Sequence, residues 1–519
     1  MKKSRVQTGG GPGRPPAPPP GGARPTIDTG HRNLAEMTAA AWEAMRLANG
    51  DEPKYFASGS QVVMLVDRGQ QLPTVLALDF YSLRRELATC TDWMRFDGDG
   101  HPWDEFPVKA CVETMLSYPN PPLPALNRVV GVPVLRPDGT LLDRAGYDAV
   151  SGLYLYPTCD VVLPDGQLGP DDIAAALAVI DALLCDFPFV GSADRALAFA
   201  TLLEPFVRET FEGPTPLRCV DAVSGQGTGK DLLATTLMYP FAGREESALT
   251  EGSTDDEWRK RLTAALLRKP TFIYISNVQR TLDSAALAAA LTTTNWEDRI
   301  LGQSRTVVLP NRSTWIATGN GITTSRELRR RVLKIVLDAR QECPWLRTGF
   351  RHNLVEWRQE HRGEIVGAAL TLATAWVQRG RPLGTAVLGS YERWAATMGG
   401  ILDAAGVPGF LENLGGAQES FDEETRQLLD FLRAWWATFG SRAVTAGELR
   451  TGLSEDVLPL AVSDGFSGGQ TIRLGKLLVG LVGRHLGGVH VALATPDRSR
   501  KLQRYRLETV ETHPQFPEV

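Results

Sequence analysis

Residues 218–238 constrain the fold of this chain most, because they follow the order strand, glycine-rich loop, lysine and helix. The apolar run 218–223 predicts a buried strand, and the run 232–238 predicts a helix. Glycines between them let successive backbone N–H groups face a phosphate, and the helix N-terminus adds positive potential. We therefore expect an α/β sheet with a phosphate-binding loop. Its predicted nucleotide-binding residues are Ser224, Gly225, Gln226, Gly227, Thr228, Gly229, Lys230 and Asp231.

This loop departs from the pattern G-x-x-x-x-G-K-[ST] at two positions. Ser224 stands where the first glycine belongs, and Asp231 replaces the hydroxyl residue that normally ligates Mg²⁺. Lys230 keeps its place, from which a lysine reaches the β- and γ-phosphates. Glycine-rich turns between a strand and a helix also occur as simple tight turns, so the loop by itself leaves both interpretations open.

Two further apolar runs predict strands that end in polar residues. The first, 271–277, ends in Ser276 and Asn277, and the second, 313–320, ends in Asn320. Ligands of open α/β sheets bind outside the carboxyl ends of the strands, so Asn320 is suited to sensing a γ-phosphate or orienting water. Arg330 and Arg331 follow, and they are suited to reaching the γ-phosphate of a neighbouring subunit as an arginine finger. The alternative is a solvated basic helix end.

The stretch from the loop through Thr318-Gly319-Asn320 to the two arginines resembles the AAA+ helicase part of primase–helicases. This family is related to helicase superfamily three and is carried by phages, plasmids and integrative mobile elements. Further similar phrases are 131–154, 287–292, 298–302, 344–347 and 399–411, so the likeness covers roughly residues 34–510. No primase module with its own metal-binding acids is apparent in front. The resemblance implies that Lys230 binds the phosphates of ATP, that Asn320 is a sensor, and that Arg330 with Arg331 acts in trans, which requires a ring, expected to be hexameric.

The Mg²⁺ ligands that the resemblance implies are altered in this chain. The family ends its second strand in Asp-Asn, whereas this chain has Ser276-Asn277. We hypothesise an exchange in which Asp231 provides the carboxylate and Ser276 the hydroxyl, since Mg²⁺ needs hard oxygen ligands. The alternative is a decayed ATPase that binds nucleotide but turns over slowly. The acids at 255–257 could supply a water-activating group, or they simply begin an exposed helix.

The C-terminal region predicts three helices followed by a two-stranded hairpin. The helices are expected at 423–439, from a capping box at 445–448, and at 472–485, and the strands at 489–494 and 503–507. This is the plan of a winged helix, which binds DNA or serves as a protein-docking module. The residues expected to contact DNA, mostly at phosphates, are Arg473, Lys476, Arg484, Arg498, Arg500, Lys501 and Arg504.

The fold class expected is α/β, with a P-loop AAA+ ATPase core, an N-terminal α/β domain and a C-terminal winged-helix domain. A hydrophobic content of 43% excludes wholesale disorder, and a net charge of −5 excludes a globally basic nucleic-acid coat. The expected segments are a disordered basic Pro/Gly tail (1–30), the N-terminal α/β domain (31–165), a helical connector (166–205), the ATPase core (206–345), a helical lid (346–420) and the winged-helix domain (421–512).

The function expected from these features is an ATP-dependent, ring-forming DNA helicase or translocase acting in replication of a mobile element. A separate primase or polymerase is a possible partner, and ATP and Mg²⁺ are the expected cofactors. The alternative is a nucleotide-gated DNA-binding protein with weak or no ATP hydrolysis. No apolar run reaches the ~18 residues that a membrane helix needs, so no membrane contact and a cytoplasmic location are expected. The six dispersed cysteines are interpreted as reduced core residues.

Overall fold

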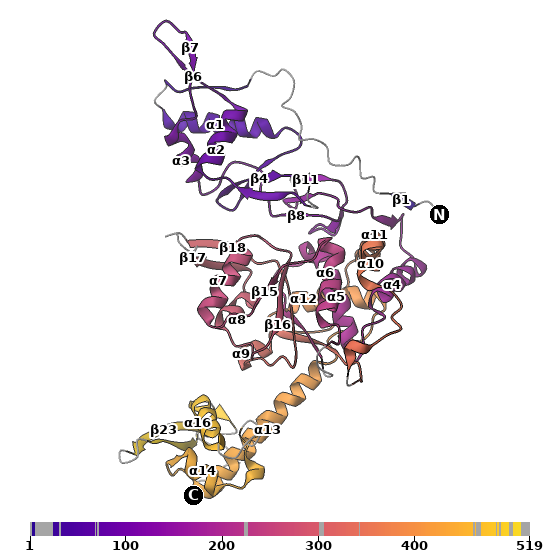
Figure 1. Ribbon diagram of the computed structural model, residues 1–519, viewed down its shortest axis with the longest axis vertical. Coiled ribbons are helices and arrows are strands. Elements are labelled where there is room, and N and C mark those ends of the chain that lie inside the picture. The colour runs from indigo at the N-terminus through magenta and orange to yellow at the C-terminus, as the bar shows by residue number, and fades with distance from the viewer. Residues whose placement is uncertain are drawn as a thin grey trace. The chain divides into compact units, whose positions relative to one another are not determined.

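The computed structural model divides the chain into two compact units, residues 1–411 and 412–519. Figure 1 traces the chain from indigo to yellow. The residues that the structure describes are 3–5, 24–30, 33–67, 69, 72–222, 227–299, 306–341, 343–459, 462, 469–483, 485–486, 489–497 and 502–509.

A five-stranded parallel sheet forms the centre of the first unit. Its strands, in spatial order, are β15 (Ala248–Leu249), β16 (Phe272–Val278), β19 (Thr314–Gly319), β14 (Leu217–Ala222) and β20 (Val332–Leu337). Every neighbouring pair is parallel, so all carboxyl ends lie at one edge. Every residue of β14 and β19 is buried, as expected for central strands of a parallel sheet covered on both faces. The predicted mixed α/β fold with a parallel sheet is confirmed.

Helices cover both faces of this sheet. Ile273 and Trp315 pack in one hydrophobic cluster with residues of α7 (Asp255–Leu266) and α8 (Ala285–Thr292). On the other face, Phe272 contacts Phe241 of α6 (Lys230–Ala242). Alternating side chains of one strand therefore point to different helix layers. The remaining elements of this region are η1 (Arg208–Thr210), the antiparallel pair β17 (Asn295–Arg299) and β18 (Thr306–Pro310), α9 (Arg326–Arg329) and η2 (Pro344–Leu346).

The predicted helical connector is an integral part of this unit. Every residue from 193 to 207 of α5 (Ser192–Val207) except Arg195 is buried, and α5 packs against α6 and β20. Its Glu204 forms an ion pair with Arg218 of β14, with 2.7 Å between the oxygen and the nitrogen and both side chains fully buried. The region expected as a helical lid (346–420) contains two helices that meet at His361. α11 (Arg362–Gln378) and α12 (Glu392–Ala405) pack against α5, and α4 (Pro170–Leu184) and α10 (Leu354–Glu360) pack against α11.

Residues 24–165 form the mixed α/β region expected from the sequence. Asn33 caps the start of α1, and Gly50 caps its end. The helices are α1 (Leu34–Asn49), α2 (Phe80–Cys90) and α3 (Lys109–Leu116). The strands are β2 (Thr26–Asp28), β3 (Tyr55–Ser58), β4 (Gln61–Val66), β5 (Thr74–Ala77), β6 (Asp92–Phe96), β7 (Pro102–Asp104), β8 (Arg128–Val130), β9 (Val134–Leu135), β10 (Leu141–Leu142), β11 (Gly146–Asp148), β12 (Leu153–Leu155) and β13 (Val162–Pro164).

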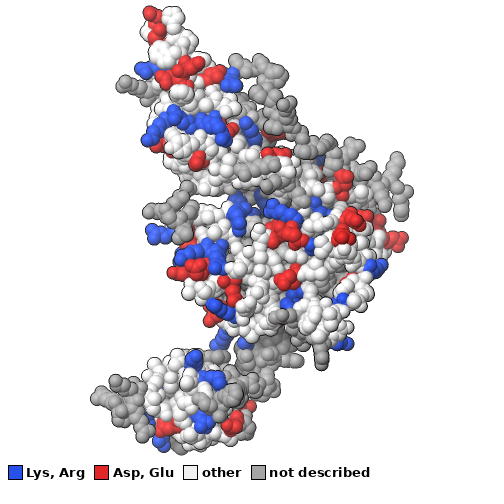
Figure 2. Space-filling model, viewed as in Figure 1, with Lys and Arg blue, Asp and Glu red and all other residues white. Residues whose placement is uncertain are grey.

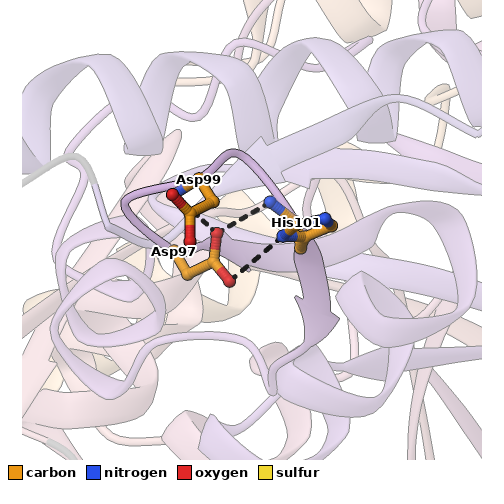
Figure 3. A group of neighbouring side chains, drawn as sticks. All are labelled: Asp97, Asp99 and His101. Atoms are coloured by element: carbon orange, nitrogen blue, oxygen red, sulfur yellow. Dashed lines mark hydrogen bonds and ion pairs between the residues drawn. The ribbon is translucent and has the colours of Figure 1, made fainter.

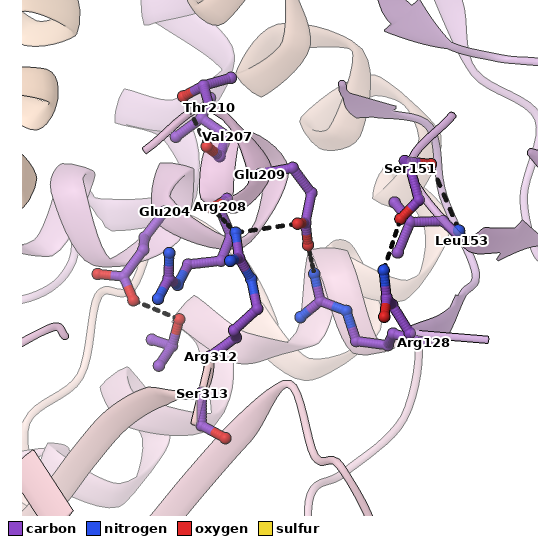
Figure 4. Close-up of polar contacts among 12 residues, drawn as sticks. Arg128, Ser151, Leu153, Glu204, Val207, Arg208, Glu209, Thr210, Arg312 and Ser313 are labelled. Atoms are coloured by element: carbon purple, nitrogen blue, oxygen red, sulfur yellow. Dashed lines mark hydrogen bonds and ion pairs between the residues drawn. The ribbon is translucent and has the colours of Figure 1, made fainter. Parts of the chain in front are cut away.

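Glu209 connects this region to the central sheet. Its carboxylate lies 2.9 Å from Arg128 of β8 and 3.0 Å from Arg312, just before β19 (Figure 4). The guanidinium of Arg312 also donates to the backbone carbonyl of Arg208 at 2.9 Å. Ion pairs shielded from water in this way are screened less by salt than exposed pairs.

The prediction that residues 1–30 are a disordered tail is wrong for two described segments, which form strands. β1 (Lys3–Arg5) pairs antiparallel with β13, and β2 pairs in parallel with β6. Backbone hydrogen bonds to partners far along the chain offset the ordering entropy that the Pro/Gly-rich composition alone cannot. Residues 6–23, which carry most of that composition, lie outside the described part.

The second unit contains three described α-helices and a four-stranded antiparallel sheet. The helices are α13 (Leu414–Phe439), α14 (Ala446–Gly452) and α16 (Gln470–Leu481), with a short η3 (Glu455–Val457). The sheet order is β21 (Val444–Thr445), β24 (Leu502–Thr509), β23 (Val489–Asp497) and β22 (His485–Leu486). Thr445 and Glu448 form the predicted capping box. The predicted third helix ends at Leu481 rather than His485, which belongs to β22.

None of the described helices is long and apolar enough to cross a lipid bilayer. All six cysteines are free thiols, as predicted, but only Cys111 and Cys219 are buried and Cys185 is exposed. The interpretation of every cysteine as a core residue is therefore wrong. On the face shown in Figure 2, acidic and basic side chains are mixed over the described surface.

Candidate functional site

The glycine-rich loop joins β14 to the N-terminus of α6. Ser224, Gly225 and Gln226 lie outside the described residues, which resume at Gly227. Gly227 and Gly229 have φ values of +79° and +94°, a left-handed conformation that glycine adopts without steric cost. Thr228 between them is buried, and Lys230 is the first residue of the 13-residue helix α6. The free N–H groups and the dipole of such a helix end attract anions.

Lys230 and Asn320 meet at the carboxyl edge of the sheet. The Lys230 side chain is 7% exposed, and its Nζ donates a hydrogen bond to Asn320 Oδ1 at 2.6 Å. Burial lowers the pKa of Lys230, while the carboxylates of Asp231 and Asp221 oppose this shift. The structure therefore brings together two residues 90 positions apart, one predicted in the phosphate-binding loop and the other at a strand end.

Asp221 fixes the turn that carries Asn320, and the sequence analysis did not single it out. This buried carboxylate accepts hydrogen bonds from the backbone N–H groups of Gly321 at 2.8 Å and Ile322 at 2.9 Å. It also lies 3.2 Å from Nζ of Lys334. The signal was an acid near the end of a strand that is apolar apart from Arg218, because a buried charge needs partners.

Asp231 is held by two hydroxyl groups from neighbouring strands. Its Oδ1 accepts hydrogen bonds from Tyr274 of β16 at 2.7 Å and from Thr318 of β19 at 2.6 Å. Thr318 in turn accepts from the backbone N–H of Asn277 at 3.2 Å. Asn277 has φ +54°, and the ladder between β16 and β19 shifts register between Ile275 and Val278. The polar ends of the loop helix and of two strands thus form one hydrogen-bonded group.

The donors at this edge suit a hard cation such as Mg²⁺. Asp231 offers a carboxylate on the exposed start of α6, and half-buried Ser276 offers a hydroxyl beside Asn277. Oxygen ligands of this kind, completed by water and phosphate oxygens, are what Mg²⁺ takes in proteins. Asp231 and Ser276 therefore fit the predicted ligand set in chemistry.

Another group of potential metal ligands is an exposed turn between β6 and β7. Asp97, Asp99 and His101 are the one set of three such side chains that lie close together among the described residues (Figure 3). Oδ1 of Asp97 accepts from the backbone N–H groups of Asp99 at 2.9 Å and His101 at 2.8 Å. This carboxylate therefore closes the turn.

Arg330 and Arg331 lie at the opposite edge of the sheet from Lys230. They connect α9 to the beginning of β20, and the carbonyl of Arg331 accepts from the N–H of Leu217, the first residue of β14. The loop, by contrast, follows the last residue of β14. Arg330 is exposed, and Arg331 forms an ion pair with Glu327 of the same chain. Within one chain these arginines do not reach the lysine.

The acids at 255–257 begin α7, whose N-cap is Thr254. Asp255 accepts hydrogen bonds from the Ser284 hydroxyl at 2.6 Å and the Ala286 N–H at 2.9 Å. It therefore joins α7 to the start of α8, in the manner of a helix cap.

The basic residues predicted to contact DNA differ in how they are placed. Lys476 is exposed on α16. Arg473 donates a hydrogen bond to the carbonyl of Val462 at 3.2 Å, and Arg504 donates one to the carbonyl of Ala443 at 2.6 Å. Both side chains therefore bind backbone within the second unit. Outside the described residues lie Arg484, Arg498, Arg500 and Lys501.

Comparisons with known proteins gave matches among solved structures. No protein-family model matches the chain, and no curated protein matches it in sequence. JCV helicase bound to a small acetamide compound matches with a TM-score of 0.23 and 19% identity, over 41% of this chain and 56% of that one. This chain thus spans little more than half of that helicase.

Two other matches cover more of both chains. The C-terminal region of NrS-1 matches with a TM-score of 0.35 and 12% identity, over 90% of this chain and 99% of that one. SCCmec type IV Cch, described as an active helicase, matches with a TM-score of 0.31 and 9% identity, over 87% and 90%. All these TM-scores lie below 0.5, so the function proposed below depends on the geometry of the site. The chain is similar to solved helicase structures, as its motifs predicted.

Proposed function

We propose that this chain is an ATP-dependent, ring-forming DNA helicase or translocase that acts in replication of a mobile element. One observation carries the proposal. The buried lysine at the start of α6 lies 2.6 Å from an asparagine at the carboxyl end of a neighbouring parallel strand. Positive potential, a lysine and a polar strand end then converge where a bound nucleotide would place its β- and γ-phosphates.

In this proposal each polar group at the edge has a distinct role. Lys230 binds the phosphates together with the loop N–H groups, and Asn320 senses the γ-phosphate or orients the attacking water. Asp231 and Ser276 would hold Mg²⁺, which when bound neutralises charge on the phosphate oxygens. Asp221 keeps Asn320 in place through the backbone of the following turn.

The ring is proposed from the position of the two arginines. Arg330 and Arg331 lie at the edge of the sheet away from the loop of their own chain, so they would serve the site of an adjacent subunit. We propose six subunits, as in the helicases that the motifs resemble.

DNA binding is proposed for the second unit as a winged-helix domain. Its three helices and antiparallel strands, with Lys476 exposed on α16, support this assignment. A separate primase or polymerase would complete the replication machinery.

The first experiment measures ATP hydrolysis with and without single-stranded DNA, for the wild type and Lys230→Ala. We expect hydrolysis that DNA stimulates and that the substitution abolishes. Nucleotide binding without turnover would instead favour the second candidate, a nucleotide-gated DNA-binding protein, which the unusual Asp231 and Ser276 favour. Failure of an assembled, ATP-hydrolysing ring to unwind a forked duplex would contradict the helicase assignment.

The ligand exchange has its own test. Asp231→Thr with Ser276→Asp should keep more ATPase activity than either single substitution, because the pair restores one carboxylate and one hydroxyl around Mg²⁺. If both single variants are fully active, the exchange is wrong.

A further inference from the structure

Asp231 occupies a place normally held by a hydroxyl residue, and the structure surrounds one of its oxygens with two hydroxyl donors. Tyr274 and Thr318 come from adjacent strands, 43 and 87 positions along the chain from Asp231. Their own hydroxyl oxygens are 3.5 Å apart, so the three side chains form a closed triangle. Among the described residues, these hydroxyls are the side-chain donors to Asp231.

This arrangement leaves the two carboxylate oxygens of Asp231 in different situations. Both short bonds go to Oδ1, and no described residue donates a hydrogen bond to Oδ2 in the same way. Thr318 and Tyr274 are both buried, whereas Asp231 is exposed. The triangle therefore anchors the carboxylate through Oδ1 and leaves Oδ2 without a hydrogen bond from the described residues.

The direction of the hydrogen bond from Tyr274 follows from the chemistry of the two groups. An ionised carboxylate carries no proton and can only accept, so the phenol O–H of Tyr274 donates the hydrogen bond to Oδ1 of Asp231. Hydrogen bonds to a charged acceptor are about twice as strong as neutral ones, which favours a single orientation of Asp231.

We propose that Tyr274 and Thr318 are positioning residues that hold the Asp231 carboxylate by Oδ1, so that Oδ2 is free to bind a divalent cation beside the nucleotide. The inference rests on the proposed nucleotide site and deepens it. Partners that orient a metal ligand limit the entropy lost when the cation binds, and removing one typically costs about 10- to 100-fold in metal affinity or activity. Without the triangle, a lone exposed aspartate would sample several rotamers.

The test measures binding of Mn²⁺, as a spectroscopic substitute for Mg²⁺, to the full-length protein saturated with a non-hydrolysable ATP analogue. Electron paramagnetic resonance measures the concentration of free Mn²⁺, so the result does not depend on ATP hydrolysis. The variants are Tyr274→Phe, Thr318→Val and the pair, with Thr318→Ser as the conservative variant that keeps the hydroxyl. Tyr55→Phe is the matched control, because the buried Tyr55 also donates to a carboxylate, that of Glu86 at 2.8 Å, in the N-terminal region.

We expect each single variant to weaken Mn²⁺ binding about tenfold and the pair to weaken it further. Thr318→Ser and Tyr55→Phe should bind Mn²⁺ within about twofold of the wild type, since neither removes a positioning hydroxyl. Affinity for the analogue in EDTA should be unchanged in all of them, because the triangle acts through the cation. Equal Mn²⁺ affinity in wild type and variants would overturn the inference.

Two further outcomes separate this inference from the proposed function. If the wild type does not bind the analogue at all, the proposed function fails. If it binds the analogue but Mn²⁺ does not tighten that binding, the nucleotide site stands and the positioning role is overturned. If a thermal unfolding assay shows that Tyr274→Phe is not folded, the Mn²⁺ affinity of Thr318→Val tests the positioning role. That substitution removes the other hydroxyl at nearly constant side-chain volume.

Discussion

At the scale of single residues, the site combines positions that a motif predicts with positions that only the fold can provide. Lys230 and Asn320 were predicted because a loop pattern and a polar strand end each have a local signature. Tyr274 and Thr318 were missed because alternation within a strand indicates which face a side chain occupies but not which partner it meets on another element. The sequence identified Asp231 as unusual. Its two hydroxyl donors could not be predicted, because that requires knowing which strands lie side by side in the sheet.

Replacement of Asn320, the proposed sensor residue, should separate ATP hydrolysis from nucleotide binding. We expect Asn320→Ala to reduce the ATP turnover rate by about 100-fold, because one oriented polar group is lost where charge develops. Nucleotide affinity should change by less than about threefold, since Lys230 and the loop remain. Steady-state kinetics and a fluorescent-nucleotide titration measure the two quantities. Asn353→Ala, at an exposed helix start without a side-chain cap bond, is the control.

Gly227 is predicted to be irreplaceable for nucleotide binding. A Cβ at this position would lie 2.8 Å from Cβ of Trp345 and 3.1 Å from its backbone nitrogen, in addition to the cost of φ +79°. Gly227→Ala should therefore displace the loop and weaken nucleotide binding at least about tenfold. It should also lower the free energy of unfolding by the ~1–2 kcal/mol that a non-glycine residue costs in the left-handed conformation. Gly380→Ala, with φ +85° and open space around it, should lose stability only. Equal nucleotide affinities for the two variants would show that the contact with Trp345 is unimportant.

At the scale of elements, a buried acid holds together four pieces of the first unit. Glu204 of α5 accepts hydrogen bonds from Thr314 of β19 at 2.5 Å and Trp394 of α12 at 2.7 Å, and it pairs with Arg218 of β14. The sequence predicted residues 166–205 only as a helical connector, because a pattern of apolar residues does not indicate what a helix packs against.

Removing one member of this buried pair should destabilise the protein more than removing both. Arg218→Met should lower the free energy of unfolding by about 3–5 kcal/mol, because it leaves the Glu204 carboxylate buried and uncompensated. Glu204→Gln combined with Arg218→Met should recover a large part of that loss. Denaturant unfolding followed by tryptophan fluorescence measures both. A double variant as unstable as the sum of the singles would contradict coupling between the two side chains.

At the scale of the whole molecule, the chain separates into units at residues 411 and 412. The sequence predicted the mixed α/β character of the first unit and most elements of the second, because long periodic segments and capping residues are local signals. The extent of the first unit was not predicted, since Glu204, Glu209 and Arg312 make contacts that depend on distant segments. Residues 24–411 therefore hold the complete candidate nucleotide site.

Truncation after Leu411 should leave this site folded and remove most DNA affinity. We expect nucleotide affinity within about twofold of the full chain, because every side chain of the site precedes residue 411. DNA affinity should fall at least about tenfold, and the dependence of binding on salt should become shallower, since fewer phosphate contacts remain. Fluorescence anisotropy across a salt series tests this, and an unchanged salt slope would argue against a DNA-binding role for the second unit.

The placement of the loop and of the two arginines at opposite edges of one sheet means that two inactive proteins could together be active. In the proposed ring, a subunit with Lys230→Ala would still offer its arginines to a neighbour, and a subunit with Arg330→Ala and Arg331→Ala would still offer its loop. In an equal mixture assembled at random, about a quarter of the head-to-tail interfaces would pair an intact loop with intact arginines. Recovery of ATP turnover on mixing the two variants would therefore reveal that each site is shared between subunits.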